Sequence, residues 1–320
     1  MNRTDLAILF PGQGSQEPGM GRDVADAMPE AMDLWKKAER ASGLPLRAIY
    51  WDGGDDKAMA DTRNLQPALT VVNLSLWLRL AGRVAPACAA GHSLGEYAAA
   101  AASGALSVDR TLELVSLRGQ LMAEADPDGK GAMAAVLKLA LADVEDVVRE
   151  AAEATGQMIR IANYNTPGQL VLSGTRDAIA DAAARVKDRK GRALVLPVSG
   201  AFHSPLMDEA AKELAKAMRS ATWSRPRFAV YCNVTGRAVT DGESLHEAMT
   251  RQMTSSVQWI STVTNQWNDG VRRWVEAGPK GVLTKMVGPI LAASGVPAAE
   301  EGGWAAEGAG SLETADALTI

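Results

Sequence analysis

The feature that most constrains this chain is a serine between two glycines at the junction of two apolar segments. The motif is Gly91-x-Ser93-x-Gly95, with the small apolar run 85–90 before it and an alanine-rich run after it. The first run predicts a buried strand and the second a buried helix, which is the context of a nucleophile elbow. In an elbow, free N–H groups at the helix N-terminus stabilise an oxyanion. An ordinary glycine–serine turn is the alternative, but the strand–turn–helix context favours the catalytic interpretation.

Composition and charge exclude several classes of protein. The chain has 320 residues, of which 47% are apolar and 22% charged, as in soluble globular proteins. Its net charge of −5 disfavours nucleic acid as a partner, and no apolar stretch is long enough to span a bilayer. The N-terminus has no signal-peptide pattern, and Cys88 and Cys232 lie in strand-like apolar runs. We therefore expect a cytoplasmic protein with buried reduced thiols and without a metal or other cofactor.

The alternation of elements predicts an α/β fold with two parts. Up to residue 126, short strands alternate with long helices, which is typical of a parallel sheet. From 127 to 198 the order becomes strand–helix–strand–strand–helix–strand, the ferredoxin-like unit, which we interpret as an inserted subdomain. Residues 1–126 and 199–291 then form the large domain. We expect the Ala/Gly/Glu-rich segment 292–320 to be a flexible tail.

A catalytic serine needs a base, and the chain contains only three histidines. His92 is adjacent to Ser93, so its side chain is expected to point elsewhere. His246 lies on a polar helical segment, which indicates a surface residue. His203 lies in the loop where the subdomain rejoins the large domain, and such junctions often form sites. A lone histidine is more often structural, but if Ser93 is catalytic, elimination leaves His203 as the base.

Five motifs then carry a resemblance to a known family. In chain order the motifs are Phe10-Pro11-Gly12-Gln13-Gly14-Ser15-Gln16, Gly91-His92-Ser93-Leu94-Gly95-Glu96-Tyr97, Leu117-Arg118-Gly119, Gly200-Ala201-Phe202-His203-Ser204 and Glu276-Ala277-Gly278-Pro279. In these motifs the chain resembles malonyl-CoA:acyl carrier protein transacylases and the acyltransferase domains of polyketide synthases, over residues 5–290. That resemblance implies an α/β-hydrolase-like large domain with a parallel-sheet core and an inserted ferredoxin-like (βαββαβ) subdomain, which agrees with the order of elements above.

The resemblance implies a role for each group around the serine. Ser93 would take the malonyl group as an ester. His203 would deprotonate Ser93 and then protonate the departing CoA thiol. The backbone N–H groups of Gln13 and Leu94 would form the oxyanion hole, which explains why the glycine loop beside the elbow carries little bulk.

The resemblance also implies a set of substrate-binding residues. Arg118 would hold the malonyl carboxylate in a bidentate pair, although a surface arginine on an amphipathic helix is the alternative. Gln252 would orient His203 and help to position the acyl group. Phe202 would fill the space that a 2-methyl branch needs, because a phenylalanine at this place accompanies malonyl preference in the related polyketide domains. Asn163 and Asn165 would line the cleft from the subdomain, and turn chemistry explains them nearly as well.

The expected activity is transfer of malonyl from malonyl-CoA to the phosphopantetheine thiol of holo-acyl carrier protein by a monomer, in fatty acid synthesis. A discrete acyltransferase of a polyketide or malonate-decarboxylase system would look similar. A serine thioesterase or esterase shares the serine and histidine, but hydrolases usually place an acid between them in chain order. Here that interval holds the subdomain, whose acids fall largely on helical faces. A catalytically silent carrier-binding module is the remaining alternative.

Overall fold

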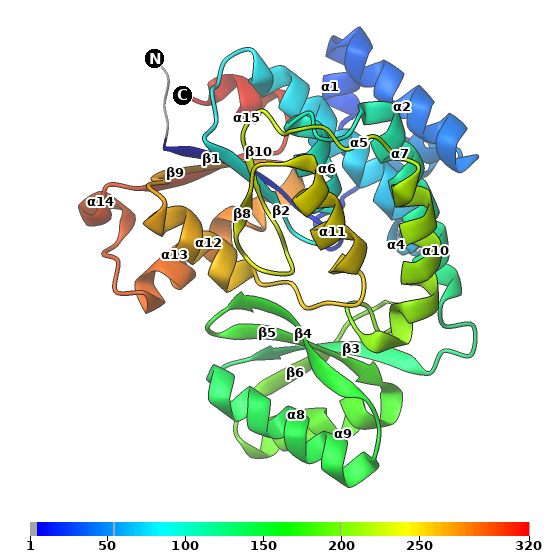
Figure 1. The fold of residues 1–320 in the computed structure, drawn as a ribbon, viewed down its shortest axis with the longest axis vertical. Helices are drawn as coiled ribbons and strands as arrows, with labels where there is room; N and C mark the ends of the chain where they lie inside the picture. The colour runs from blue at the N-terminus through cyan, green and yellow to red at the C-terminus, as the bar shows by residue number, and fades with distance from the viewer. Residues whose placement is uncertain (1–4, 54, 199, 320) are drawn as a thin grey trace.

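Two β-sheets organise the chain into a large and a small part, as the computed structural model shows (Figure 1). The structure describes residues 5–53, 55–198 and 200–319. The segment 1–4, where no signal-peptide pattern was found, and the predicted domain boundary at Ser199 lie outside the described residues.

The large part is built on a six-stranded sheet in the order β10-β9-β1-β2-β7-β8. Neighbouring strands are parallel except β7 and β8, so the sheet is mixed but mainly parallel. The α/β prediction with a parallel sheet is therefore confirmed. β1 and β2 lie at the centre and are buried along their whole length, which explains their continuous apolar runs. The strands are β1 (Leu6–Phe10), β2 (Cys88–Gly91), β7 (Ala229–Tyr231), β8 (Ala238–Val239), β9 (Arg273–Ala277) and β10 (Ala305–Ala309).

Helices cover this sheet, and those nearest the elbow are the most buried. α5 is buried on nearly every side, and α6 is buried at every position. The helices begin at polar caps where the sequence offers them: Asp61 accepts from the backbone of α5, and Ser107 from that of α7. They are α1 (Arg22–Ala27), α2 (Pro29–Ser42), α3 (Leu46–Trp51), α4 (Asp56–Ala60), α5 (Thr62–Ala81), α6 (Gly95–Ala102), α7 (Val108–Glu124), α10 (Asp208–Arg219), α11 (Gly242–Gln252), α12 (Trp259–Asn268) and α13 (Thr284–Ala293), with short 3₁₀ turns at Pro205–Met207 and Pro279–Gly281.

The small part has the predicted order of elements, and its four strands are antiparallel in the order β4-β5-β3-β6. These elements occupy residues 131–195, within the expected insert 127–198. Figure 1 shows the two helices on the outer face of this sheet, with the other face turned towards the large part. The elements are β3 (Gly131–Leu137), α8 (Leu141–Thr155), β4 (Ile159–Thr166), β5 (Gln169–Thr175), α9 (Arg176–Asp188) and β6 (Arg192–Val195).

Alternating side chains divide the small sheet between the two parts. On β3, Met133 and Ala135 join the core of the large part, whereas Ala134 and Val136 pack with the helices α8 and α9. Because successive side chains on a strand point to opposite faces, one short strand serves both cores. The sheet thus forms one wall of the space between the two parts.

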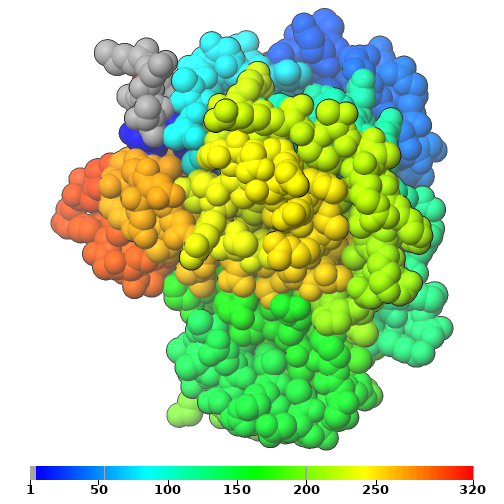
Figure 2. Space-filling view, in the orientation of Figure 1, coloured from blue at the N-terminus to red at the C-terminus, as the bar shows by residue number. Residues whose placement is uncertain are grey.

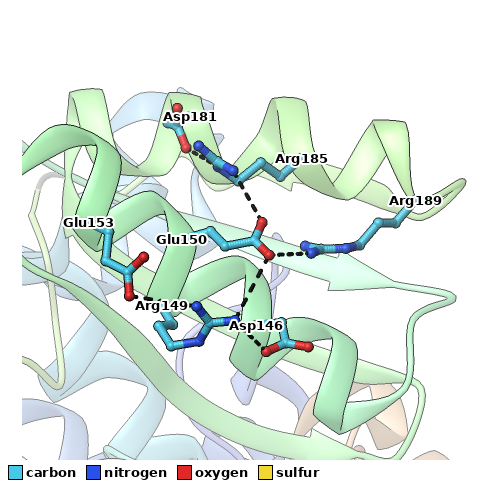
Figure 3. Close-up of polar contacts among 7 residues, drawn as sticks. All are labelled: Asp146, Arg149, Glu150, Glu153, Asp181, Arg185 and Arg189. Atoms are coloured by element: carbon cyan, nitrogen blue, oxygen red, sulfur yellow. Dashed lines mark hydrogen bonds and ion pairs between the residues drawn. The ribbon is translucent and has the colours of Figure 1, made fainter.

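An ion-pair network, hereafter the outer network, joins α8 to α9 on the outer face of the small part (Figure 3). Glu150 accepts from Arg185 at 3.1 Å and from Arg189 at 2.7 Å. Arg149 pairs with acids of its own helix, Asp146 among them at 2.8 Å. The side chains keep about a third to two-thirds of their surface in solvent, so salt screens them. The network consists of Asp146, Arg149, Glu150, Glu153, Asp181, Arg185 and Arg189.

The C-terminal segment corrects the prediction of a flexible tail at 292–320. Its strand β10 pairs in parallel with β9, between the short helices α14 (Ala299–Gly302) and α15 (Leu312–Ala317). Trp304 packs edge-to-face on Trp274, and Arg83 donates to the carbonyl oxygen of Ala315 at 2.7 Å. Figure 2 shows the orange-to-red region around α13 and α14 packed against the large part. Backbone hydrogen bonds to β9 hold β10 in the sheet, and its side chains are mostly small. Such a strand needs no broad apolar face, so its sequence shows no apolar periodicity.

Within the described ranges, no helix combines the length and the apolar character needed to cross a bilayer.

Candidate active site

The backbone at Ser93 has the shape of an elbow between β2 and α6. Ser93 has a φ of 50°, in the left-handed region that non-glycine residues seldom adopt. A Cβ added to Gly91 would lie 1.9 Å from the Gly95 carbonyl carbon, and one added to Gly95 would lie 1.9 Å from the Phe10 carbonyl oxygen. Both positions of the motif therefore require glycine for packing, and the predicted strand–turn–helix context is present.

Ser93 and His203 are in hydrogen-bond contact although 110 residues separate them in the chain. Ser93 Oγ lies 2.7 Å from His203 Nε2. The other ring nitrogen, Nδ1, lies 3.1 Å from the carbonyl oxygen of Gln252 and 3.0 Å from that of Ser255. Since carbonyl oxygens only accept, Nδ1 carries the proton and Nε2 presents its lone pair to the serine. This tautomer is the one that a general base needs.

The protonation of His203 is set mainly by its surroundings. The imidazole is buried, and burial together with the nearby charge of Arg118 lowers its pKa to about 3. Both effects disfavour the imidazolium, so the ring is neutral and can accept a proton at neutral pH.

Arg118 points at the serine from α7. It is 1% exposed, and its Nη2 donates to Ser93 Oγ at 3.1 Å. Nη2 also donates to Gln252 Oε1 at 3.1 Å, and Nη1 to Gln66 Oε1 at 2.8 Å. All three of these acceptors are neutral, and burial lowers the pKa of the guanidinium. A buried cation that faces neutral acceptors is suited to receive an anion. The alternative of a surface arginine is thereby excluded.

The expected oxyanion-hole groups lie beside the elbow. Gln13 and Leu94 line the same cleft as Ser93. Neither backbone N–H donates a hydrogen bond to another residue in the described part of the chain. A Cβ on the neighbouring Gly12 would lie 2.4 Å from the His92 carbonyl oxygen, so the glycine loop can approach the elbow only without a side chain. Two free N–H groups next to a nucleophile are what an oxyanion requires.

The remaining predicted residues line a cleft between the two parts, with a volume of about 250 Å³. Phe202, Asn163 and Asn165 all reach it. His92 does not point away from the site as expected, because its Nε2 meets Asn165 Oδ1 at 2.8 Å. His246 lies half-buried against Trp223 at a ring distance of 5.2 Å.

In the described ranges, no group of three or more His, Cys, Asp or Glu side chains is arranged to hold a metal ion. Cys88 and Cys232 are both buried free thiols, and burial raises the pKa of each.

Several site residues were not found from the sequence. Asn233 clamps the elbow: its Oδ1 accepts from Ser93 N and its Nδ2 donates to the Gly91 carbonyl oxygen, each at 2.6 Å. Gln66 and Ser255 contact Arg118 and His203 as described above. Asn233 follows a short strand, Gln66 lies inside a helix, and Ser255 acts through its backbone. No spacing rule marks such residues, and only the Asn233 position after a strand next to β2 offered a signal.

The sequence is similar to known acyltransferases. The chain matches the acyl transferase domain family over residues 8–317. It is 38% identical over 292 residues to the malonyl CoA-acyl carrier protein transacylase of Escherichia coli strain K12, covering 90% of this chain and 93% of the relative.

Solved structures give the same result. The malonyl-CoA:acyl carrier protein transacylase of Xanthomonas oryzae pv. oryzae superposes with a TM-score of 0.89 at 35% identity, covering 98% of this chain and 97% of that one. A malonyl-transacylase in complex with its type II polyketide synthase acyl-carrier protein has a TM-score of 0.89 at 32% identity, with 98% of each chain covered.

Proposed function

The chain belongs to the acyl transferase domain family, and on that premise we propose that it transfers a malonyl group from malonyl-CoA to the phosphopantetheine thiol of an acyl carrier protein. The observation that carries the proposal is the position of Ser93 Oγ, 2.7 Å from His203 Nε2 and 3.1 Å from Arg118 Nη2. His203 supplies the general base, and Arg118 supplies the binding site for the acyl carboxylate.

The first half-reaction loads the serine. His203 Nε2 takes the Ser93 hydroxyl proton as Oγ attacks the thioester carbonyl carbon of malonyl-CoA. The negative charge that develops on the carbonyl oxygen is stabilised by the N–H groups of Gln13 and Leu94. When the tetrahedral intermediate collapses, the carbon–sulfur bond breaks and the imidazolium returns its proton to the CoA thiolate. The products are free CoA and malonyl-Ser93.

The second half-reaction reverses these roles. The phosphopantetheine thiol gives its proton to His203 Nε2 and attacks the ester carbonyl carbon. The same two N–H groups hold the oxyanion. The carbon–oxygen bond to Ser93 then breaks, and the proton passes from His203 to Oγ, which restores the resting site. Phosphopantetheine can compete with water because the serine lies in a cleft lined mainly by apolar groups.

Two residues select the acyl group in this proposal. Arg118 pairs with the malonyl carboxylate through both arms of its guanidinium while Gln66 and Gln252 keep their contacts to it. Each terminal nitrogen carries two N–H groups, so Nη1 offers its second N–H, and Nη2 offers the one that donates to Ser93 Oγ in the free protein. Phe202 is buried and lines the cleft, where its ring occupies the space that a 2-methyl branch needs. Asn163 bounds the acyl site from the small part.

Further features of the proposal concern the fold and the setting. We describe the large part, 1–126 and 199–291 extended by β10, as hydrolase-like because the nucleophile follows a central parallel strand and opens a helix, with 127–198 as the inserted subdomain. We place the enzyme in the cytoplasm, where buried thiols such as Cys88 stay reduced. We assign it to fatty acid synthesis and to the monomeric state. The gene neighbourhood and the mass in solution test these two assignments.

A direct assay separates transfer from hydrolysis. The protein is incubated with malonyl-CoA, with and without holo-acyl carrier protein, while malonyl-carrier and free malonate are both measured. The proposal predicts that malonyl-carrier forms faster than malonate in the presence of the carrier, and that little malonate appears without it. Rapid release of malonate regardless of the carrier would instead identify a thioesterase.

A further inference from the structure

A buried carboxyl group beneath the elbow has no place in the mechanism described so far. Glu96 lies in the first turn of α6 and is 0% exposed. Its Oε2 accepts from Gln252 Nε2 at 2.7 Å, and its Oε1 accepts from Asn233 N at 3.2 Å. Burying a carboxyl group costs free energy unless hydrogen bonds compensate for the lost water. The two residues that donate to Glu96 are themselves hydrogen-bonded to the backbone of Ser93.

The carboxyl group fixes the direction of the Gln252 side chain. Gln252 Nε2 donates both to Glu96 Oε2 at 2.7 Å and to the Ser93 carbonyl oxygen at 2.8 Å. The Ser93 carbonyl oxygen can only accept, and the carboxylate form of Glu96 accepts as well, so the amide must present its NH₂ group to them. Its oxygen is then forced to the opposite side, where it accepts from Arg118 Nη2 at 3.1 Å.

The direction of the amide decides what Arg118 meets. In the observed orientation the guanidinium faces an oxygen of Gln252, and a second amide oxygen on Gln66 holds its other arm at 2.8 Å. A flipped Gln252 would turn an NH₂ group against the guanidinium, donor against donor. The fork would then lose one of its supports. A bidentate pair with a carboxylate depends on the orientation of the fork, so the effect would reach the acyl group.

We propose that Glu96 is a positioning residue that holds the Arg118 fork in place through Gln252 and thereby selects acyl groups that carry a carboxylate. The inference rests on the proposed malonyl transfer and deepens it. Glu96 does not touch the substrate and takes part in no proton transfer. Together with the Ser93 carbonyl oxygen, it holds the Gln252 amide in one orientation.

A second buried carboxyl group supplies a matched control. Glu276 is also 0% exposed, and burial raises the pKa of both glutamates to about 7. Its oxygens accept from the backbone N–H groups of Val282, Leu283 and Thr284 instead of from Gln252. Replacing Glu276 therefore removes a buried carboxyl group of the same kind without acting on the amide of Gln252.

The test measures the ratio of acetyl-CoA to malonyl-CoA use, as kcat/KM for acylation of Ser93. In Glu96→Ala this ratio should rise about tenfold, because malonyl use falls while the neutral acetyl group does not need the fork. Glu96→Gln should shift it in the same direction by about threefold, since Gln252 and Asn233 donate to different oxygens of Glu96 and glutamine replaces one of these oxygens with an NH₂ group, which only donates. Glu276→Gln should leave the ratio unchanged. If the alanine variant does not fold, the glutamine variant decides.

A double-mutant cycle with Arg118→Ala separates positioning from a general structural effect. Once the guanidinium is absent, the further change Glu96→Ala should not alter the acetyl-to-malonyl ratio. An equal loss of acetyl and malonyl use in the Glu96 variants would overturn the inference, as would a ratio change that persists without Arg118. Loss of malonyl loading in the wild-type protein would instead refute the proposed function, so the two failures are distinguishable.

Discussion

The outer network and the cluster at the cleft both depend on arginine but use it in opposite ways. In the outer network, Arg185 and Arg189 pair directly with the carboxylate of Glu150 and stay partly in solvent (Figure 3). At the cleft, Arg118 is 1% exposed and donates to two amide oxygens and a hydroxyl. We call this cluster the inner network; it consists of Gln66, Ser93, Glu96, Arg118, His203 and Gln252.

This difference distinguishes an arginine that can bind a ligand from one that belongs to a solvated surface ion pair. A charge that is already paired and hydrated gains little from another partner. A buried charge with neutral acceptors keeps its capacity for an ion of opposite sign. Changes in the inner network should therefore alter chemistry and selectivity strongly, whereas changes in the outer network should alter stability slightly.

The largest effect is expected from the base. His203→Ala should slow acylation of Ser93 by about 100- to 10,000-fold, as expected for loss of a positioned general base. Rapid-quench measurement with malonyl-CoA gives the rate. His246→Ala, half-buried against Trp223, is the matched control and should react normally. A near-normal rate for His203→Ala at neutral pH would move the base role to His92 or elsewhere.

The pH profile of the wild-type enzyme follows from the same histidine. Because burial and Arg118 lower the His203 pKa to about 3, the ring stays neutral as the pH falls through 6.5, the ordinary histidine value. The acylation rate should therefore not follow a histidine titration near pH 6.5, and should fall only in more acidic solution. A half-maximal rate close to pH 6.5 would contradict this assignment of the protonation state.

The next effect concerns selectivity. Arg118→Ala should leave Ser93 reactive but raise the ratio of acetyl to malonyl use by at least about 100-fold, the scale of one desolvated charged hydrogen-bond pair. Arg118→Lys should recover only part of the preference, since a point charge lacks the fork. Arg189→Ala in the outer network should not change the ratio. Equal loss of both activities in Arg118→Ala would make Arg118 a packing residue.

The smallest effect is expected in the outer network. Glu150→Gln weakens the contacts to two arginines of α9, but those groups remain hydrated. The melting temperature should fall by no more than about 2 °C, and less at high salt, with acyl transfer unchanged. Calorimetry at two salt concentrations checks this. A large fall in melting temperature, or altered selectivity, would erase the distinction between the two networks.

Much of the fold was predictable because the spacing of apolar residues and the positions of turn-forming residues mark its helices and strands. The sequence predicts the strand–helix order of the small part, and its elements lie within the predicted range 127–198. The C-terminal segment was misjudged as a flexible tail for the opposite reason. The strand Ala305–Ala309 carries small residues and one glutamate, and it is held by backbone pairing to β9. Pairing of this kind leaves no hydrophobic period to detect.

The site was predictable only for residues that belong to a recognisable motif or that remain after the other histidines are eliminated. Ser93 stands in an elbow, and His203 was the remaining histidine; the structure brings the two into contact. Asn233 and Glu96 are single polar residues whose significance comes from the groups that the fold packs around them. The sequence places them 137 positions apart, yet the two are hydrogen-bonded. Buried polar partners of this kind appear only when the tertiary structure is known.

The most direct test of acyl transfer through Ser93 is the intact mass of the protein after incubation with malonyl-CoA in the absence of a carrier. The wild-type protein should gain the mass of one malonyl group, and the adduct should disappear when holo-acyl carrier protein is added. Ser93→Ala should gain nothing under the same conditions. An adduct that persists on Ser93→Ala would contradict the assignment of the nucleophile and with it the proposed mechanism.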